Sequence, residues 1–145
     1  YSKRKGSLVL STSEDPELNR DRIVLIANEL ASDLRAVGID CAAAVDLPHA
    51  LATSEMSTLY DCIYDFAFVA LDTKKPSLLY HLGTRSDGTA ELRAVLESDD
   101  DDDLLARPQA VELERTLEAR DVIFVLSGDA GELRLVARVR LGGDA

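Results

Sequence analysis

The residues of this chain that could act as metal ligands or nucleophiles are few and scattered. Two histidines, His49 and His81, and two cysteines, Cys41 and Cys62, lie apart from one another in a sequence of 145 residues. A metal site needs several His, Cys or carboxylate ligands at helical or short-loop spacings, and neither histidine has such companions. We therefore expect no metal site. We expect both cysteines to be buried thiols, with a disulfide between them as the alternative.

Phosphate-binding and nucleophile motifs are absent from the sequence. A nucleotide site on a β-α-β unit normally has glycines in its first strand–helix turn, where the backbone approaches the phosphate. The corresponding segment here, Ser11–Asp15, has no glycine and ends in two carboxylates. No Gly-x-Ser-x-Gly motif occurs either. We therefore predict no catalytic residue and no cofactor, although the hydroxyl groups of Ser11–Asp15 could hold a small polar ligand.

Carboxylates lie near the ends of several expected helices and strands. Acid–base catalysis needs two of them placed across a substrate with separated pKa values. Asp46 and Asp72 lie near the carboxyl ends of expected strands, where open α/β sheets usually bind ligands. They make an alternative site together with Ser11–Asp15. The whole set is Glu14, Asp15, Asp46, Asp61, Asp65 and Asp72.

The first half of the chain has the pattern of alternating strands and helices. A helix that begins at Asp15-Pro16 and ends at Gly38 has apolar residues at spacings of three and four. Apolar runs and alternating residues predict the strands on either side of it, which a right-handed crossover would make parallel. The expected elements are strand Gly6–Ser11, helix 16–37, strand Ile39–Leu47, helix Ser54–Tyr64 and strand Phe66–Leu71.

The second half ends in a hairpin. Apolar and alternating residues on either side of a glycine-containing turn predict two antiparallel strands. A run of five aspartates, Asp99–Asp103, is expected to be a solvated, mobile loop because it cannot pack. The other expected elements are strand Ser77–Leu82, a short helix Ala90–Glu97, helix Pro108–Ala119, and the hairpin strands Val122–Leu126 and Glu132–Leu141.

Together these elements predict an α/β fold. We expect a three-layer sandwich with a mixed sheet of about five strands, a β-α-β-α-β first half and a C-terminal antiparallel hairpin. Residues 1–145 form a single domain in this interpretation. The chain begins with Tyr1 rather than Met, so we interpret it as part of a larger protein.

One face of the last strand carries an unusual stripe of arginines. Leu133 and Leu135 fall on the opposite face, which we expect to be buried. Two interpretations remain open: the stripe contacts RNA phosphate or an acidic partner, or it keeps a sheet edge from aggregating. The predicted partner-binding residues are Arg134, Val136, Arg138 and Arg140.

The charge of the chain limits its partners. A formal net charge of −11 repels phosphodiester backbones at long range and so disfavours RNA binding. No run of about 18 apolar residues is present, so no membrane-spanning segment is expected. We expect a cytoplasmic protein.

The segments Leu34–Cys41, Val45–Leu47 and Leu59–Cys62 carry a resemblance to a known family, together with Ser7–Ser11 and Phe66–Leu71. In this order they resemble the anticodon-binding domain of class II aminoacyl-tRNA synthetases, especially the histidyl-tRNA-synthetase-like version found also in starvation-sensing translation-factor kinases. The resemblance covers residues 6–71. The basic tRNA surface is missing, so the resemblance implies a degenerate version used for protein contact or dimerisation.

The function expected from the sequence is therefore a non-catalytic binding or dimerisation module of a translation-linked regulatory protein. Its partner would be another protein or a second copy of the chain. One alternative is a small-ligand sensor or enzyme domain with its site at the carboxyl ends of the strands. The other alternative is a tRNA-binding domain.

Overall fold

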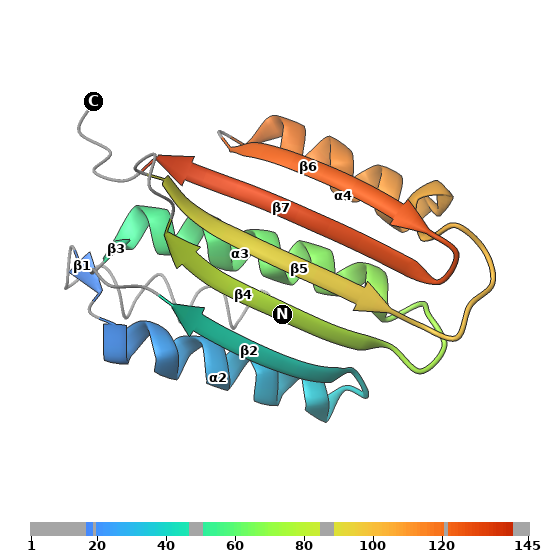
Figure 1. Ribbon diagram of the computed structural model, residues 1–145, viewed down its shortest axis with the longest axis horizontal. Helices are drawn as coiled ribbons and strands as arrows, with labels where there is room; N and C mark the ends of the chain where they lie inside the picture. Colours follow the sequence, from blue (N-terminus) through green and yellow to red (C-terminus); the bar gives the residue numbers. More distant parts are fainter. Residues whose placement is uncertain (1–16, 19, 47–50, 85–88, 121, 141–145) are drawn as a thin grey trace.

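A five-stranded sheet forms the framework of the molecule (Figure 1). The computed structural model describes residues 17–18, 20–46, 51–84, 89–120 and 122–140. Only the first two strands in the sheet order are parallel, and all other neighbours are antiparallel. Across the sheet the order is β2 (Asp40–Asp46), β4 (Ser77–Thr84), β5 (Thr89–Glu97), β7 (Glu132–Arg140) and β6 (Ile123–Asp129).

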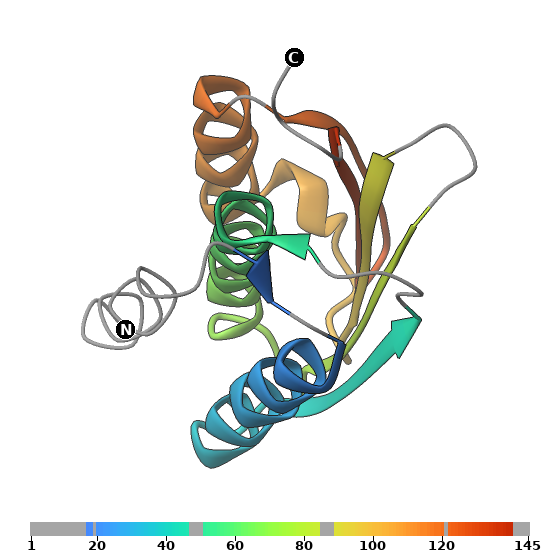
Figure 2. The same cartoon turned by 90° about the vertical axis from the view of Figure 1, so that its left-hand side faces the viewer.

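The helices lie along one face of this sheet, as Figure 2 shows. A short antiparallel pair, β1 (Glu17–Leu18) with β3 (Leu51–Ala52), and a 3-10 helix, η1 (Leu104–Ala106), complete the described elements. The predicted α/β class, the mixed five-stranded sheet and the C-terminal hairpin are confirmed. The described elements form two layers, helices and sheet, where the sequence predicted three (Figure 2). The α-helices of the described residues are α2 (Arg20–Ala36), α3 (Thr53–Ala70) and α4 (Pro108–Ala119).

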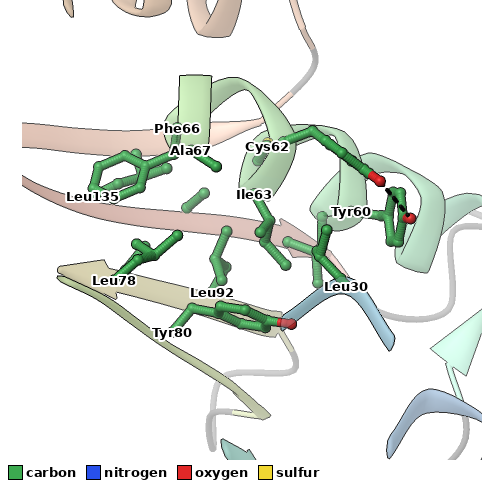
Figure 3. Packing of buried hydrophobic residues seen from close by; sticks show 14 of the residues in the cluster. Leu30, Tyr60, Cys62, Ile63, Phe66, Ala67, Leu78, Tyr80, Leu92 and Leu135 are labelled. Carbon is green, nitrogen blue, oxygen red and sulfur yellow. Dashed lines mark hydrogen bonds between the residues drawn. The ribbon is translucent and has the colours of Figure 1, made fainter. Parts of the chain in front are cut away.

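The core lies between the helices and the sheet (Figure 3). Side chains alternate across a strand, so every second residue of the sheet faces the helices. Tyr80 of β4 is fully buried, and its hydroxyl donates a hydrogen bond of 2.5 Å to the Ala27 carbonyl of α2. This bond joins the sheet to a helix. The largest wholly buried side chains include Ile23, Leu30, Leu59, Ile63, Phe66, Leu78 and Tyr80.

The first helix follows its sequence pattern only from Arg20, because Glu17–Leu18, predicted to be its first turn, form strand β1. Ile23, Ala27 and Leu30 are buried on one face of α2, as their spacing predicted. The helix ends before Gly38, which has a φ of 94° in the left-handed region that favours glycine. The amide of Ile39 then donates to the carbonyl of Leu34 at 3.0 Å, closing the helix terminus.

The predicted strand Phe66–Leu71 is wrong, because α3 continues to Ala70. This helix is buried on most of its surface, so its apolar residues form a continuous run rather than a stripe. A run of that kind does not distinguish a buried helix from a buried strand. The predicted strand Gly6–Ser11 lies outside the described residues, and among the described strands only β2 and β4 pair in parallel.

The predicted short helix Ala90–Glu97 is also wrong, because these residues form β5 at the centre of the sheet. Ala, Glu, Leu and Arg favour helices. Alternate residues, Ala90, Leu92, Ala94 and Leu96, are nevertheless buried, and β4 and β7 pair with the strand on both sides. Tertiary pairing therefore overrides local helix propensity here.

Candidate functional site

A groove with both apolar and polar lining residues lies between α3 and α4. We call it the α3–α4 groove. It encloses about 290 Å³, near the lower limit of ligand pockets. Phe68 and the buried Leu113 provide apolar surface, and Phe68 is 58% exposed. The lining residues are Asp65, Phe68, Pro108, Gln109, Glu112, Leu113 and Thr116.

Polar pairs connect α3 and α4 at two levels of the groove. The amide group of Gln109 donates to the carboxylate of Asp72 at 2.8 Å. Further along, the guanidinium of Arg120 forms an ion pair with the carboxylate of Asp65. Both members of this ion pair remain about one-fifth exposed, with side-chain values of 21% and 19%. Two lining residues of the groove, Gln109 and Asp65, are therefore held by Asp72 and Arg120, which lie beside the groove and not in its lining.

If residues 53–70 had been predicted as a helix, their spacing would have placed the groove residues Asp65 and Phe68 on one face. Asp61, Asp65, Phe68 and Asp72 follow one another at spacings of four, three and four, which align on one helix face. The sequence prediction missed Phe68 because it placed that residue in a strand. It missed Gln109 and Glu112 because their position depends on how α4 packs against α3.

The nearby Cys62 is not poised to act as a nucleophile. Its side chain is buried, and the guanidinium of Arg120 lies 3.9 Å from its Sγ atom. Burial raises the pKa of the Cys62 thiol to about 11, although Arg120 acts in the opposite direction. Cys41 is also buried, and burial likewise raises the pKa of its thiol to about 11. Both cysteines are free, which confirms the predicted buried thiols.

The N-terminal end of α4 is held by an arginine. Arg107 precedes the helix, and its Nη2 lies 2.9 Å from Asp100 and 2.8 Å from Asp102. Its Nη1 also donates to the backbone carbonyl of Asp72 at 2.7 Å. The prediction that Asp99–Asp103 cannot pack is wrong at Asp100, whose side chain is only 6% exposed. Arg107 therefore connects three segments beside the α3–α4 groove.

The predicted partner-binding residues lie on the other face of the sheet. Arg138 contacts Glu91 at 3.0 Å, and Arg134 contacts Glu132 at 3.1 Å. Val136 is partly buried between them on β7. Arg140 ends the strand, where its backbone is paired with Thr89. Their role in partner binding stays a prediction.

The alternative site at the strand ends is not assembled. Asp46 ends β2, whereas Asp72 belongs to the loop whose Pro76 accepts a hydrogen bond from Asp40 at the start of β2. The two aspartates therefore lie near opposite ends of that strand. Ser11–Asp15, the third part of this site, lies outside the described residues.

The remaining candidate ligands do not converge in the described part of the chain. His81 packs on β4 beside Gly83, and His49 lies outside the described residues. No group of three or more His, Cys, Asp or Glu side chains that could hold a metal ion is found among residues 17–140 where they are described. Within the same residues, no helix combines the length and apolar character that a membrane span requires.

A second groove, between α2 and α3, is more apolar. It encloses about 280 Å³, and Phe68 belongs to both grooves. Val37 and Leu71 line it and are more than half exposed. Asp33 and Tyr64 are its polar lining residues, so this groove offers fewer hydrogen-bonding groups than the α3–α4 groove.

Comparison with known structures relates the fold to that of histidine kinase domains. No protein-family model and no curated protein sequence matches the chain. The histidine kinase domain of the blue-light-activated kinase EL346 from Erythrobacter litoralis matches with a TM-score of 0.63 and 8% identity, over 96% of this chain and 74% of that one. The catalytic domain of the histidine kinase ThkA matches with a TM-score of 0.55 and 6% identity, over 86% of this chain and 94% of that one.

Full-length ShkA, a further match, was solved in complex with AMPPNP. Its TM-score is 0.54 at 12% identity, over 82% of this chain and 29% of that one. At such low identities these matches show that the fold is shared. They do not by themselves transfer an activity.

These matches overturn the resemblance predicted from the sequence. The structural neighbours are histidine kinase domains rather than anticodon-binding domains of aminoacyl-tRNA synthetases. The expected role as a non-catalytic module of a translation-linked protein is therefore wrong. One of the segments that carried the resemblance, Phe66–Leu71, proved to be mostly helix rather than strand.

Proposed function

We propose that this domain binds a purine nucleotide in the α3–α4 groove, as a nucleotide-binding domain of the histidine kinase type. The observation that carries the proposal is the exposed Phe68 in one groove with the carboxylates of Asp65 and Glu112, in a fold shared with histidine kinase catalytic domains. One of the matching kinases was solved with the nucleotide analogue AMPPNP. The proposed site lies between two helices, whereas the alternative site predicted from the sequence lay at the strand ends.

Each part of the groove suits a different part of a nucleotide. Phe68 offers an aromatic face on which a base can stack. The carboxylate of Glu112 is an acceptor for the exocyclic amino group of adenine. Beside the groove, the guanidinium of Arg120, which is ion-paired with the lining residue Asp65, has the geometry that pairs with phosphate oxygens. A volume of about 290 Å³ accommodates the base and part of the sugar, so the phosphates extend out of the groove.

A divalent cation would accompany the phosphates. The net charge of −11 opposes the approach of an anionic nucleotide. Mg²⁺ is usually bound by substrate phosphates together with one or two carboxylates, and it does not require a cage made by the protein alone. Nucleoside triphosphates are intracellular, so the proposal also implies a cytoplasmic location.

Titration calorimetry with ATP and Mg²⁺ tests the proposal on the wild type and on Phe68→Ala. Base stacking on an aromatic side chain is worth about 1–3 kcal/mol, so the variant should bind at least about fivefold more weakly. Phe68 is 58% exposed, so the fold should tolerate the change.

The matched control is Leu71→Ala. Leu71 follows Phe68 by one helical turn, is 53% exposed and lines only the α2–α3 groove. The Leu71→Ala variant should bind ATP as the wild type does. Saturable binding should also raise the melting temperature, since a ligand of the folded state alone stabilises it. No saturable binding by the wild type, or unchanged affinity in Phe68→Ala, would contradict the proposal.

A further inference from the structure

The outermost strand β6 has an edge that the described residues cover only in part. β7 is its sole neighbour in the sheet (Figure 1). Near the hairpin the edge is covered, because Asp103 forms a β-bridge with Ala130 and Gly128 packs closely against Leu105. The part toward the start of the strand, Val122–Leu126, has no such cover among the described residues. An edge of this kind presents unpaired amide and carbonyl groups.

The uncovered segment lacks the usual protection of sheet edges. Its sequence is Val-Ile-Phe-Val-Leu, with no charge and no proline. Ile123 and Val125 point away from the helices and are 67% and 62% exposed. The other sheet edge, β2, begins with Asp40 and ends with Asp46. Charged side chains and prolines are the common means by which proteins prevent edge pairing. The two edges of this sheet therefore differ in their capacity to accept another strand.

We propose that β6 pairs antiparallel with β6 of a second copy of this chain, with the two-fold axis at Phe124. In this register Ile123 lies opposite the partner's Val125, and Val125 lies opposite the partner's Ile123. Four exposed β-branched residues then form one apolar cluster across the junction, and no like charges oppose each other. In such a two-fold symmetric contact both copies use the same strand edge, so no β6 edge is left free for a third copy. The contact therefore gives a dimer rather than a fibre.

The size of this contact sets its strength. Five residues of each copy take part, which is a small interface by the standards of stable complexes. Interfaces that bury less than about 1,200 Å² belong to weak or transient complexes. The dimer should therefore form at micromolar or higher protein concentration and dissociate on dilution. It involves neither groove, so it does not depend on nucleotide binding.

Sedimentation velocity over a range of protein concentrations tests the proposal. The wild type should convert from monomer to dimer as the concentration rises. Val125→Lys places a charge at the junction and should raise the dissociation constant at least about tenfold. The melting temperature of diluted protein should stay unchanged, because Val125 is 62% exposed.

Leu79→Lys is the matched control. Leu79 lies on the same open sheet face and is 54% exposed, but it belongs to β4, away from the β6 edge. Dimerisation should survive this change. Loss of the dimer in Leu79→Lys would indicate face-to-face stacking of the sheets and overturn the edge pairing. A wild type that remains monomeric throughout, or a Val125→Lys variant that dimerises normally, would overturn it as well.

A disulfide experiment tests the register. Chains with Ile123→Cys are mixed with chains carrying Val125→Cys under mild oxidation. Opposite residues of antiparallel strands have Cβ atoms within disulfide reach, so the mixed pair should cross-link. Val125→Cys alone should cross-link poorly, since in this register its own counterpart is two positions away. Efficient cross-linking of that single variant would contradict an axis at Phe124. The native cysteines are buried and should not interfere.

Discussion

At the scale of single residues, Asp100 and Arg107 organise the loops beside the α3–α4 groove. The carboxylate of Asp100 accepts a hydrogen bond of 2.9 Å from the backbone amide of Lys74, and it also contacts Arg107. Arg107 in turn binds Asp102 and the backbone of Asp72. The ion pair between Asp100 and Arg107 thus joins the segment after α3, the segment after β5 and the start of α4. Pro108 and Gln109, which line the groove, come directly after Arg107. The contacts of Arg107 therefore also hold one side of the groove in place.

The pH dependence of stability should report this contact. The hydrogen bond from the Lys74 amide, with smaller contributions from Ser98 and Arg107, lowers the pKa of Asp100 to about 2. An ordinary aspartate has a pKa of about 3.9. A carboxyl whose pKa falls on folding stabilises the protein above its unfolded pKa, and this stabilisation is lost as the pH falls through the folded value. The contribution of Asp100 should therefore be complete above about pH 4 and disappear toward about pH 2.

Urea unfolding at several pH values checks this expectation. Asp100→Asn should be less stable than the wild type at neutral pH, and the difference should shrink between about pH 4 and pH 2. Asp101→Asn, in the exposed neighbouring position, is the control and should behave as the wild type does. A difference between Asp100→Asn and the wild type that is constant with pH would contradict the role of this carboxylate.

At the scale of elements, the β6–β7 turn is docked against the loop that follows β5. The amide of Gly131 donates to the carbonyl of Asp102 at 2.8 Å, and the carbonyl of Gly131 accepts from the amide of Ser98 at 2.8 Å. Gly131 has a φ of 68°, in the left-handed region. The hairpin, the aspartate loop and α4 are therefore held in one arrangement by backbone contacts that only glycine allows.

Replacement of Gly131 by alanine should be costly for this reason. A Cβ at this position would lie 2.5 Å from the carbonyl oxygen of Asp100 and 2.9 Å from that of Ser98. Left-handed backbone costs an alanine about 1–2 kcal/mol, and here the steric conflict adds to that cost. Gly38→Ala is the matched control. Gly38 also has a positive φ, but a Cβ there would meet no atom within 4 Å.

Chemical denaturation of both glycine variants measures the difference. Gly131→Ala should lose clearly more free energy of unfolding than Gly38→Ala. Equal losses would mean that the loop moves aside at little cost and that the docking of the turn is loose.

At the scale of the whole molecule, the net charge of −11 acts on any anionic ligand. The field of the protein opposes a nucleotide at long range even if Arg120 attracts it locally. Salt screens long-range repulsion between exposed charges more than it screens close contacts. The purine-nucleotide proposal therefore carries a specific salt dependence, opposite in sign to that of proteins with basic phosphate sites.

The affinity for ATP in the absence of Mg²⁺ should rise severalfold as salt is added at low ionic strength. Adenosine, which has no phosphate, should bind with an affinity that depends little on salt. Titration calorimetry of both ligands in a salt series checks this. An ATP affinity that falls steadily with salt would indicate that local cations dominate over the charge of the whole domain.

The sequence by itself determined the elements whose signals are local. The apolar stripe of α2 and its terminal Gly38, the strand β2 and the helix that begins at Pro108 were all predicted, since spacing and end residues suffice for them. The alternation along β7 also predicted its buried face correctly. The sequence also determined the net charge of the chain and correctly predicted that both cysteines are buried.

The tertiary structure decided what depends on distant partners. Residues 66–70 are helical because α3 is covered on several sides, and Ala90–Glu97 is a strand because β4 and β7 flank it. The α3–α4 groove needs Phe68 and Gln109, which are 41 positions apart in the sequence, to meet, and no local pattern reports such a meeting. The sequence-based resemblance to another family failed for the same reason. Short apolar motifs fix neither the order of strands nor the face on which helices pack, because burial and pairing are properties of the folded chain.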